Sequence, residues 1–222
     1  MDAKIKITPD GPYMVSGSVP LEEKVIKAKG FGSEYKQGKT YPPMKTYALC
    51  RCGHSGNMPF CDGHHKYTDF DGRETASREP FFEQAEITEG PDVILADVEN
   101  LCAFARFCHQ KHGDAWELAE EGGHMEECLQ AICECPAGRL VALDKETRQP
   151  IEPVYEPSIV IIQDPGVYCS GPIWVRGGIP IESADGSVYE VRNRVTLCRC
   201  GRSDNKPFCD ATHVSIGFTD QK

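Results

Sequence analysis

The sequence predicts an α+β protein in which two β-rich halves, residues 1–75 and 156–222, flank an insert of mixed strand and helix at residues 78–150. Three observations predict this arrangement. A 17-residue motif occurs twice, short β-type runs precede each copy, and the segment between the copies has an acidic, helical pattern instead. The 222 residues allow one large domain or two to three small ones.

An internal repeat organises the two halves. Residues 49–65 read LCRCGHSGNMPFCDGHH and residues 197–213 read LCRCGRSDNKPFCDATH, so that 12 of the 17 positions are identical. Upstream, residues 11–20 and 171–180 each begin with Gly-Pro and continue as a short β-rich run. The first half carries about twelve extra residues near 29–43, where Gly, Pro and Lys predict a loop.

The insert has a different local pattern. It is predicted to contain short strands at residues 93–96 and 140–143 and acidic helices at residues 114–121 and 124–132. Gly122 and Gly123 separate the two helices. Prolines 150, 153 and 157 mark a linker, and the apolar run 158–163 opens the second half as a buried strand.

Twelve cysteines indicate either a disulfide framework or metal ligation. The N-terminus lacks the apolar region of a secretory signal, and no run approaches the roughly 18 apolar residues of a membrane span. We therefore expect a cytoplasmic protein with reduced thiols that act as ligands or redox groups. The net charge of −10 disfavours nucleic acid and anionic membranes as partners.

The spacing of cysteine and histidine within the motif predicts which of these side chains lie on the same face of the chain. Cys50 and Cys52 are two residues apart, so on an extended chain both side chains share one face. Cys61 and His65 are four residues apart, so on a helix they share a face as well. The second copy repeats this spacing with Cys198, Cys200, Cys209 and His213. Three cysteines and one histidine also form an accepted structural zinc set, so the spacing leaves zinc and iron–sulfur open.

The residue pattern C-x-C-G-x-S-x3-P-F-C-D-G-x-H resembles the CDGSH iron–sulfur domain family, which is the mitoNEET-like family. The resemblance implies one 2Fe-2S cluster in each copy, held by Cys50, Cys52, Cys61 and His65 and by Cys198, Cys200, Cys209 and His213. Tandem copies in one chain resemble the soluble tandem-motif type, which implies a monomer whose halves form one pseudo-dimeric module. Two positions depart from the family pattern: His64 replaces a small residue, and Ala211 replaces Gly.

The cysteines of the insert carry a weaker resemblance. Cys102 and Cys108 have the spacing of the first and third cysteines of a ferredoxin C-x2-C-x2-C loop, and Cys135-Pro136 resembles the remote segment that closes such a site. The insert therefore resembles the divergent mono-cluster ferredoxins. The resemblance makes Cys102, Cys108 and Cys135 ligands of a 3Fe-4S cluster, or of a 4Fe-4S cluster if Cys133 or Cys128 is added.

The alternative for the insert is a relic fold whose thiols pack in the core or bind zinc. Its histidines, which are His109, His112 and His124, are expected on the surface rather than as ligands.

These features together predict an iron–sulfur protein that transfers single electrons or stores and passes on clusters. Its partners would be unidentified redox or cluster-acceptor proteins. We find no nucleotide-binding Gly-rich loop and no G-x-S-x-G motif, so no catalytic residue is assigned, and we expect a redox carrier rather than a stand-alone enzyme. Two alternatives stay open: a redox subunit of an oxidoreductase, and a zinc-stabilised interaction module.

Overall fold

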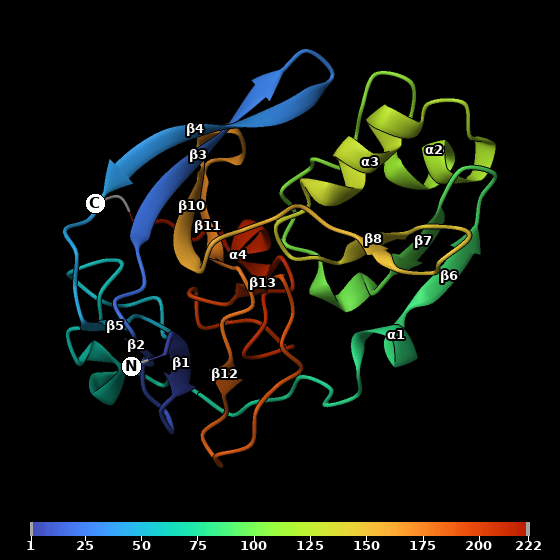
Figure 1. Ribbon diagram of the computed structural model, residues 1–222. Helices are drawn as coiled ribbons and strands as arrows, with labels where there is room; N and C mark the ends of the chain where they lie inside the picture. The colour runs from blue at the N-terminus through green and yellow to red at the C-terminus, as the bar shows by residue number, and fades with distance from the viewer. Residues whose placement is uncertain (1, 221–222) are drawn as a thin grey trace.

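The computed structural model describes residues 2–220, and within them the backbone forms three sheets (Figure 1). The first has the order β12-β1-β2-β5 and contains β1 (Lys4–Ile7), β2 (Tyr13–Ser16), β5 (Thr46–Leu49) and β12 (Ile181–Glu182). The second has the order β13-β11-β10-β3-β4 and contains β3 (Leu21–Lys29), β4 (Gly32–Thr40), β10 (Ser158–Asp164), β11 (Cys169–Arg176) and β13 (Arg194–Leu197). The protein is thus mixed and mostly sheet, as predicted.

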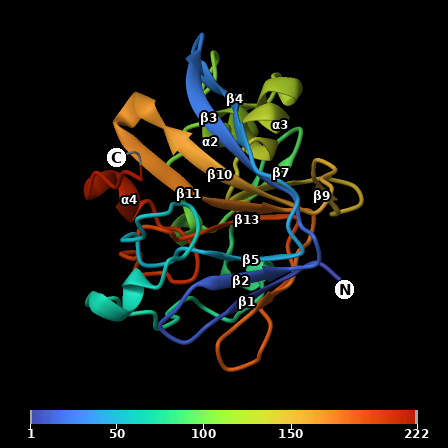
Figure 2. The same ribbon diagram turned by 90° about the vertical axis from the view of Figure 1, so that its left-hand side faces the viewer.

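Each half of the chain contributes strands to the sheet of the other. β3 follows β2 in the chain, yet it pairs in parallel with β10 of the second half, with Leu21 opposite Ile159. In the same way β12 pairs in parallel with β1, with Ile181 opposite Ile5. The two sheets lie as layers over one another (Figure 2). Their inner faces share one core, in which Ile5, Ile161 and Ile173 are fully buried, so neither half has a separate core.

The insert forms the third sheet, β6-β7-β8-β9, and its two main helices. Its elements are β6 (Glu86–Glu89), β7 (Ile94–Asp97), β8 (Leu140–Leu143), β9 (Pro150–Ile151), α2 (Ala115–Glu121) and α3 (Met125–Cys133). α2 begins where the Asp114 carboxylate accepts hydrogen bonds from the backbone N–H groups of Trp116 and Glu117, and it ends at Gly122. The strands and helices predicted for the insert are confirmed, each within one residue at its ends.

Shorter helical segments lie outside the sheets. They are α1 (Phe81–Gln84), α4 (Thr212–Ser215) and the 3-10 turns η1 (His64–Tyr67), η2 (Glu99–Leu101) and η3 (Pro165–Val167). No helix within residues 2–220 has the length and apolar character that crossing a membrane requires.

The loop predicted near residues 29–43 is wrong, because most of it is strand β4. β3 and β4 form an antiparallel hairpin at the edge of the second sheet. The exposed lysines that indicated a loop lie on this edge strand, where charge is common because it discourages further strand pairing. Tyr35 of β4 stacks on Phe107 and Trp174, with ring centroids 4.3 and 5.1 Å apart, and this packing holds the hairpin against the insert.

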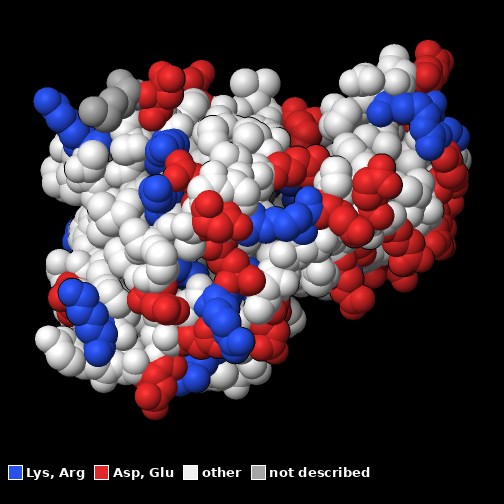
Figure 3. Space-filling model, turned by 90° about the horizontal axis from the view of Figure 1, so that it is seen from below, with Lys and Arg blue, Asp and Glu red and all other residues white. Residues whose placement is uncertain are grey.

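The negative charge of the chain is concentrated in the insert. Residues 78–150 hold 16 acidic and 6 basic side chains, against 34 and 24 in the whole chain, so the remaining residues balance at 18 of each. Figure 3 shows these acidic side chains gathered on the lobe that the insert forms. The two halves therefore present a mixed surface, whereas the insert presents an acidic one.

Candidate metal centres

The first motif brings its four predicted ligands into two close pairs. Cys50 and Cys52 follow β5, and their sulfur atoms lie 3.6 Å apart. The chain then turns back, so that the N–H of Cys61 donates to the carbonyl of Ala48 in β5 at 2.9 Å. The Cys61 sulfur lies 3.4 Å from Nδ1 of His65. Cys61 precedes the helical turn η1 rather than lying in it, and Gly63 at φ +88° makes the bend between them.

The second motif has the same geometry. The Cys198 and Cys200 sulfur atoms are 3.6 Å apart, and the Cys209 sulfur lies 3.4 Å from Nδ1 of His213. The bend before the helix is made here by Ala211, which adopts φ +70°. The substitution of Gly by Ala therefore leaves the spacing of the predicted ligands unchanged, although it places a side chain in the left-handed region.

Backbone N–H groups point at the sulfur atoms of both motifs. Cys52 and the N–H groups of Ser55 and Gly53 donate hydrogen bonds to Cys50, and these bonds lower the pKa of the Cys50 thiol to about 6 against the opposing effect of burial. Cys198 has the corresponding donors, and its pKa is likewise lowered to about 6. These donors favour the thiolate form in each Cys–Cys pair, which is the form that binds metals.

The two motifs fit a metal or an iron–sulfur cluster. A tetrahedral metal holds two thiolates roughly 3.8 Å apart at the metal–sulfur distance of about 2.3 Å known for zinc, and both Cys–Cys pairs lie close to this value. Thiolate with imidazole is a soft donor set that suits zinc and iron–sulfur clusters. Three cysteines per motif with N–H donors around them thus fit both kinds of centre.

The motifs differ in their exposure. Cys209 and His213 are buried, at 3% and 4% exposure, whereas Cys61 and His65 are half-buried. Burial, aided by the nearby charge of Arg199, lowers the pKa of His213 to about 4. The second motif therefore lies inside the protein, and the first lies nearer to solvent.

Arg51 and Arg199 support the motifs, and our reading of the sequence did not single them out. Each stands between the first two cysteines of its motif and is buried, at 3% and 1% exposure. Arg51 donates to the carbonyls of Thr8, Gly11 and Gly72, and Arg199 donates to the carbonyls of Ile162 and Gly171 and to Asp220. Their identity in both copies was the signal that could have revealed them.

The insert brings Cys102, Cys108 and Cys135 to one cavity, whose wall also includes Trp116 and Arg139. Burial, followed by the neighbouring Cys135 and Cys102, raises the pKa of Cys108 to about 12. Arg139 places its positive charge beside them and is itself paired with Asp97 at 2.6 Å.

The two candidates for a fourth ligand lie outside the lining of this cavity. The Cys133 sulfur faces the carbonyl of Ile151 at 3.5 Å, and Cys128 is buried in the core beneath α3. Neither lines the cavity of the three thiols.

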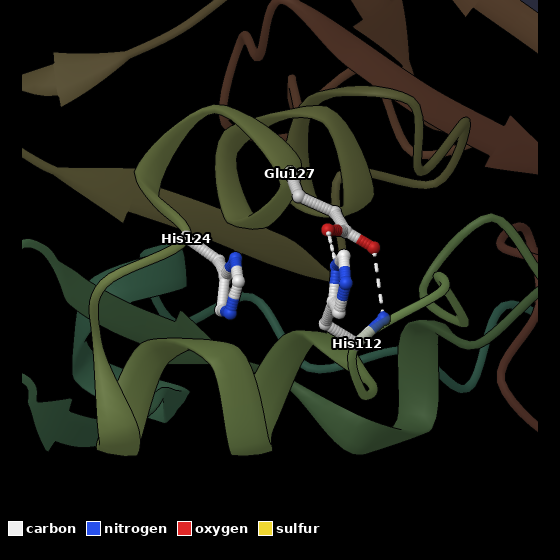
Figure 4. Close-up of side chains that lie close together, drawn as sticks. All are labelled: His112, His124 and Glu127. Carbon is white, nitrogen blue, oxygen red and sulfur yellow. Dashed lines mark hydrogen bonds and ion pairs between the residues drawn. The ribbon is translucent and has the colours of Figure 1, made fainter.

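A cluster of His112, His124 and Glu127 lies on the surface of the insert (Figure 4). Nδ1 of His112 is hydrogen-bonded to Glu127 at 2.6 Å. The two imidazole rings are stacked, 4.4 Å apart and within 5° of parallel. Lone pairs in parallel ring planes do not converge on one ion, so the cluster is a hydrogen-bonded contact between the loop that precedes α2 and helix α3. The prediction that these histidines and His109 are exposed is confirmed.

Comparison with protein families identifies three segments of the chain. The description "Iron-binding zinc finger CDGSH type" matches residues 10–66 and 170–214, and "Divergent 4Fe-4S mono-cluster" matches residues 88–145. The chain carries two CDGSH-type segments on either side of a mono-cluster segment. Its two CDGSH segments contain the two motifs described above, and the mono-cluster segment contains the cavity with three thiols. Comparison with the curated proteins gave no significant match, and comparison with the solved structures gave none.

Proposed function

We propose that this CDGSH-type protein holds three iron–sulfur clusters and acts in one-electron transfer or in the storage and transfer of clusters. Each motif would hold one 2Fe-2S cluster through its three cysteines and its histidine. The observation that carries the proposal is the identical pairing of donors in the two motifs, at 3.6 Å between sulfurs and 3.4 Å between sulfur and imidazole. Bound clusters supply the redox chemistry, and the protein sets their potential and access.

The reciprocal exchange of strands supports a pseudo-dimeric arrangement of the two halves. β3 and β12 occupy equivalent places, since each follows the second strand of its half and pairs with the first strand of the other. One chain would thus supply both halves of the module and act as a monomer.

The insert would hold the third cluster, in a ferredoxin-like fold, through Cys102, Cys108 and Cys135. Three thiols on one cavity favour 3Fe-4S, because a 4Fe-4S cluster ordinarily takes four cysteines. A 4Fe-4S cluster would need its fourth ligand from outside this cavity wall.

The experiment is a count of iron and acid-labile sulfide after anaerobic reconstitution. Two 2Fe-2S clusters with one 3Fe-4S cluster give about seven irons per chain, and with one 4Fe-4S cluster about eight. Cys61→Ser and Cys209→Ser should each remove two irons, and the triple variant Cys102→Ala, Cys108→Ala, Cys135→Ala should remove those of the insert. Zinc without sulfide in anaerobically purified protein would reject the proposal and select the zinc-stabilised interaction module.

A further inference from the structure

The cavity of the three thiols and the second motif share a wall. Cys209 of the second motif is buried in one small cluster with Ala103 and Ala137 of the insert, and the partly buried Cys135 packs against this cluster. Ala103 and Cys135 also line the cavity of the three thiols. Cys209, Ala103 and Ala137 are 3%, 5% and 2% exposed, so this cluster is closed to solvent. Residues of two different proposed sites therefore meet at one cluster, although 74 positions separate Cys135 from Cys209 in the chain.

Arg194 fixes this wall from the second half. It begins β13, the strand that leads directly to Cys198, and it is 1% exposed. Its guanidinium donates to the carbonyl of Cys135, and also to those of Ile132 and Leu140 at 3.0 Å. Its charge is balanced by Glu152 at 2.8 Å. The backbone that carries one thiol of the insert is thus tied to the strand that carries the second motif.

A second tie joins the loop of the second motif to the insert. Nδ2 of Asn205, within the motif, donates to the carbonyl of Asn100 at 2.9 Å, two residues before Cys102. In the first motif the equivalent residue is Asn57. Within residues 2–220 no hydrogen bond or ion pair joins residues 50–66 to residues 88–145.

The second motif also touches the first. The backbone at Gly201 packs against the carbonyl of Cys52, and the backbone at Gly53 packs against the carbonyl of Cys200. Figure 1 shows β13 and α4 of the second half between the insert and β5, which precedes the first motif. The three sites therefore follow one another in space as insert, second motif and first motif, an order that differs from their order in the chain.

We infer that the second motif is an internal relay, which exchanges single electrons with the site in the insert across the cluster of Ala103, Ala137 and Cys209, against which Cys135 packs. This inference rests on the proposed function. One electron leaves the group held by the insert and reduces the group held by the second motif, or the reverse, and no bond forms or breaks. An external one-electron donor protein supplies the electron. The half-exposed first motif is then the member of the series that lies nearest to solvent.

The test compares two matched single-site deletions, each reconstituted and reduced with dithionite. Cys61→Ser leaves the second motif and the insert filled, whereas Cys209→Ser leaves the first motif and the insert filled. Electron paramagnetic resonance should show magnetic coupling between the two remaining clusters, as line splitting or faster spin relaxation, in Cys61→Ser. The coupling should be absent or much weaker in Cys209→Ser. Adding the triple Cys→Ala change in the insert to Cys61→Ser should abolish the coupling.

Iron counts on the same samples separate the possible failures. Equal coupling in both variants, or none in Cys61→Ser with every expected iron present, would overturn the relay while the proposed clusters stand. If the triple Cys→Ala change removes no iron, the insert holds no cluster, and both the relay and that part of the proposed function are wrong.

Asn205→Ala, with Asn57→Ala as its matched control, tests the hydrogen bond between the loop of the second motif and the insert. When each change is added to Cys61→Ser, only Asn205→Ala should alter the magnetic coupling between the second motif and the insert. We expect both variants to keep their iron and their fold.

Discussion

Gly53 and Gly201 pack against each other's motifs in a reciprocal contact. A Cβ on Gly53 would lie 2.5 Å from the carbonyl oxygen of Cys200, and a Cβ on Gly201 would lie 2.6 Å from that of Cys52. Both glycines also have positive φ, of +78° and +80°. The contact between the motifs thus depends on two residues without side chains.

Gly53→Ala should destabilise the protein by about 2–4 kcal/mol, because it combines left-handed strain with a clash against backbone. Gly63→Ala is the matched control, since φ is +88° there and no atom lies within 4 Å of the added carbon. It should cost only about 1 kcal/mol. Urea unfolding of the two variants measures the difference, and equal losses would show that the contact between the motifs is not tight.

Ala211→Gly should stabilise the second motif by about 1 kcal/mol. Ala211 holds φ +70°, where an L-residue with a Cβ is strained by about 1–2 kcal/mol, and Gly relieves the strain at some cost in unfolded-state entropy. Chemical denaturation with the wild type as reference measures the gain. A loss of stability would mean that the methyl group contributes packing that exceeds the strain.

Arg199→Met should destabilise the protein by about 3–5 kcal/mol, because it leaves Asp220 buried without its positive partner. Iron should also be lost preferentially from the second motif, since Arg199 holds the chain between Cys198 and Cys200. Arg73→Met breaks the exposed ion pair with Asp71 and should change the stability by less than about 0.5 kcal/mol. Similar losses in both variants would refute a structural role for the buried arginine.

Acid should release iron from the first motif before the second. A histidine ligand must be neutral, and a lower pKa keeps the ring neutral to lower pH. Burial lowers the pKa of His213 from its usual 6.5 to about 4, whereas His65 is half-exposed to water. Between pH 6.5 and 4, loss of visible absorbance should therefore occur in two steps, of which the earlier disappears in Cys61→Ser.

His65→Cys should remove the acid sensitivity of the earlier step and lower the reduction potential of that site. A thiolate adds negative charge, whereas a neutral imidazole makes reduction easier, as in two-histidine Rieske centres relative to all-cysteine ones. His213→Cys is the matched variant for the later step. Potentials that are independent of pH in the wild type, with unchanged acid loss in both variants, would argue against histidine ligation.

The sequence alone determined the local part of each site. The short spacing within the pairs Cys50–Cys52 and Cys61–His65 was sufficient to predict which side chains lie together. The helix predicted for Cys61 and His65 was wrong, because the bend at Gly63 separates Cys61 from the helical turn. The helices of the insert could also be predicted, because the Asp114 cap that starts α2 and the Gly122 that ends it are local signals in the sequence.

Only the tertiary structure decided how these parts meet. Residues 29–43 were predicted as a loop, but most of them form strand β4. This strand forms because it pairs with β3, which in turn pairs with β10, more than a hundred residues away in the chain. The packing of Cys209 with Ala103 and Ala137 and the close approach at Gly53 and Gly201 likewise join distant segments. Such contacts are set by packing of complete sheets against one another, and no single stretch of sequence carries that information.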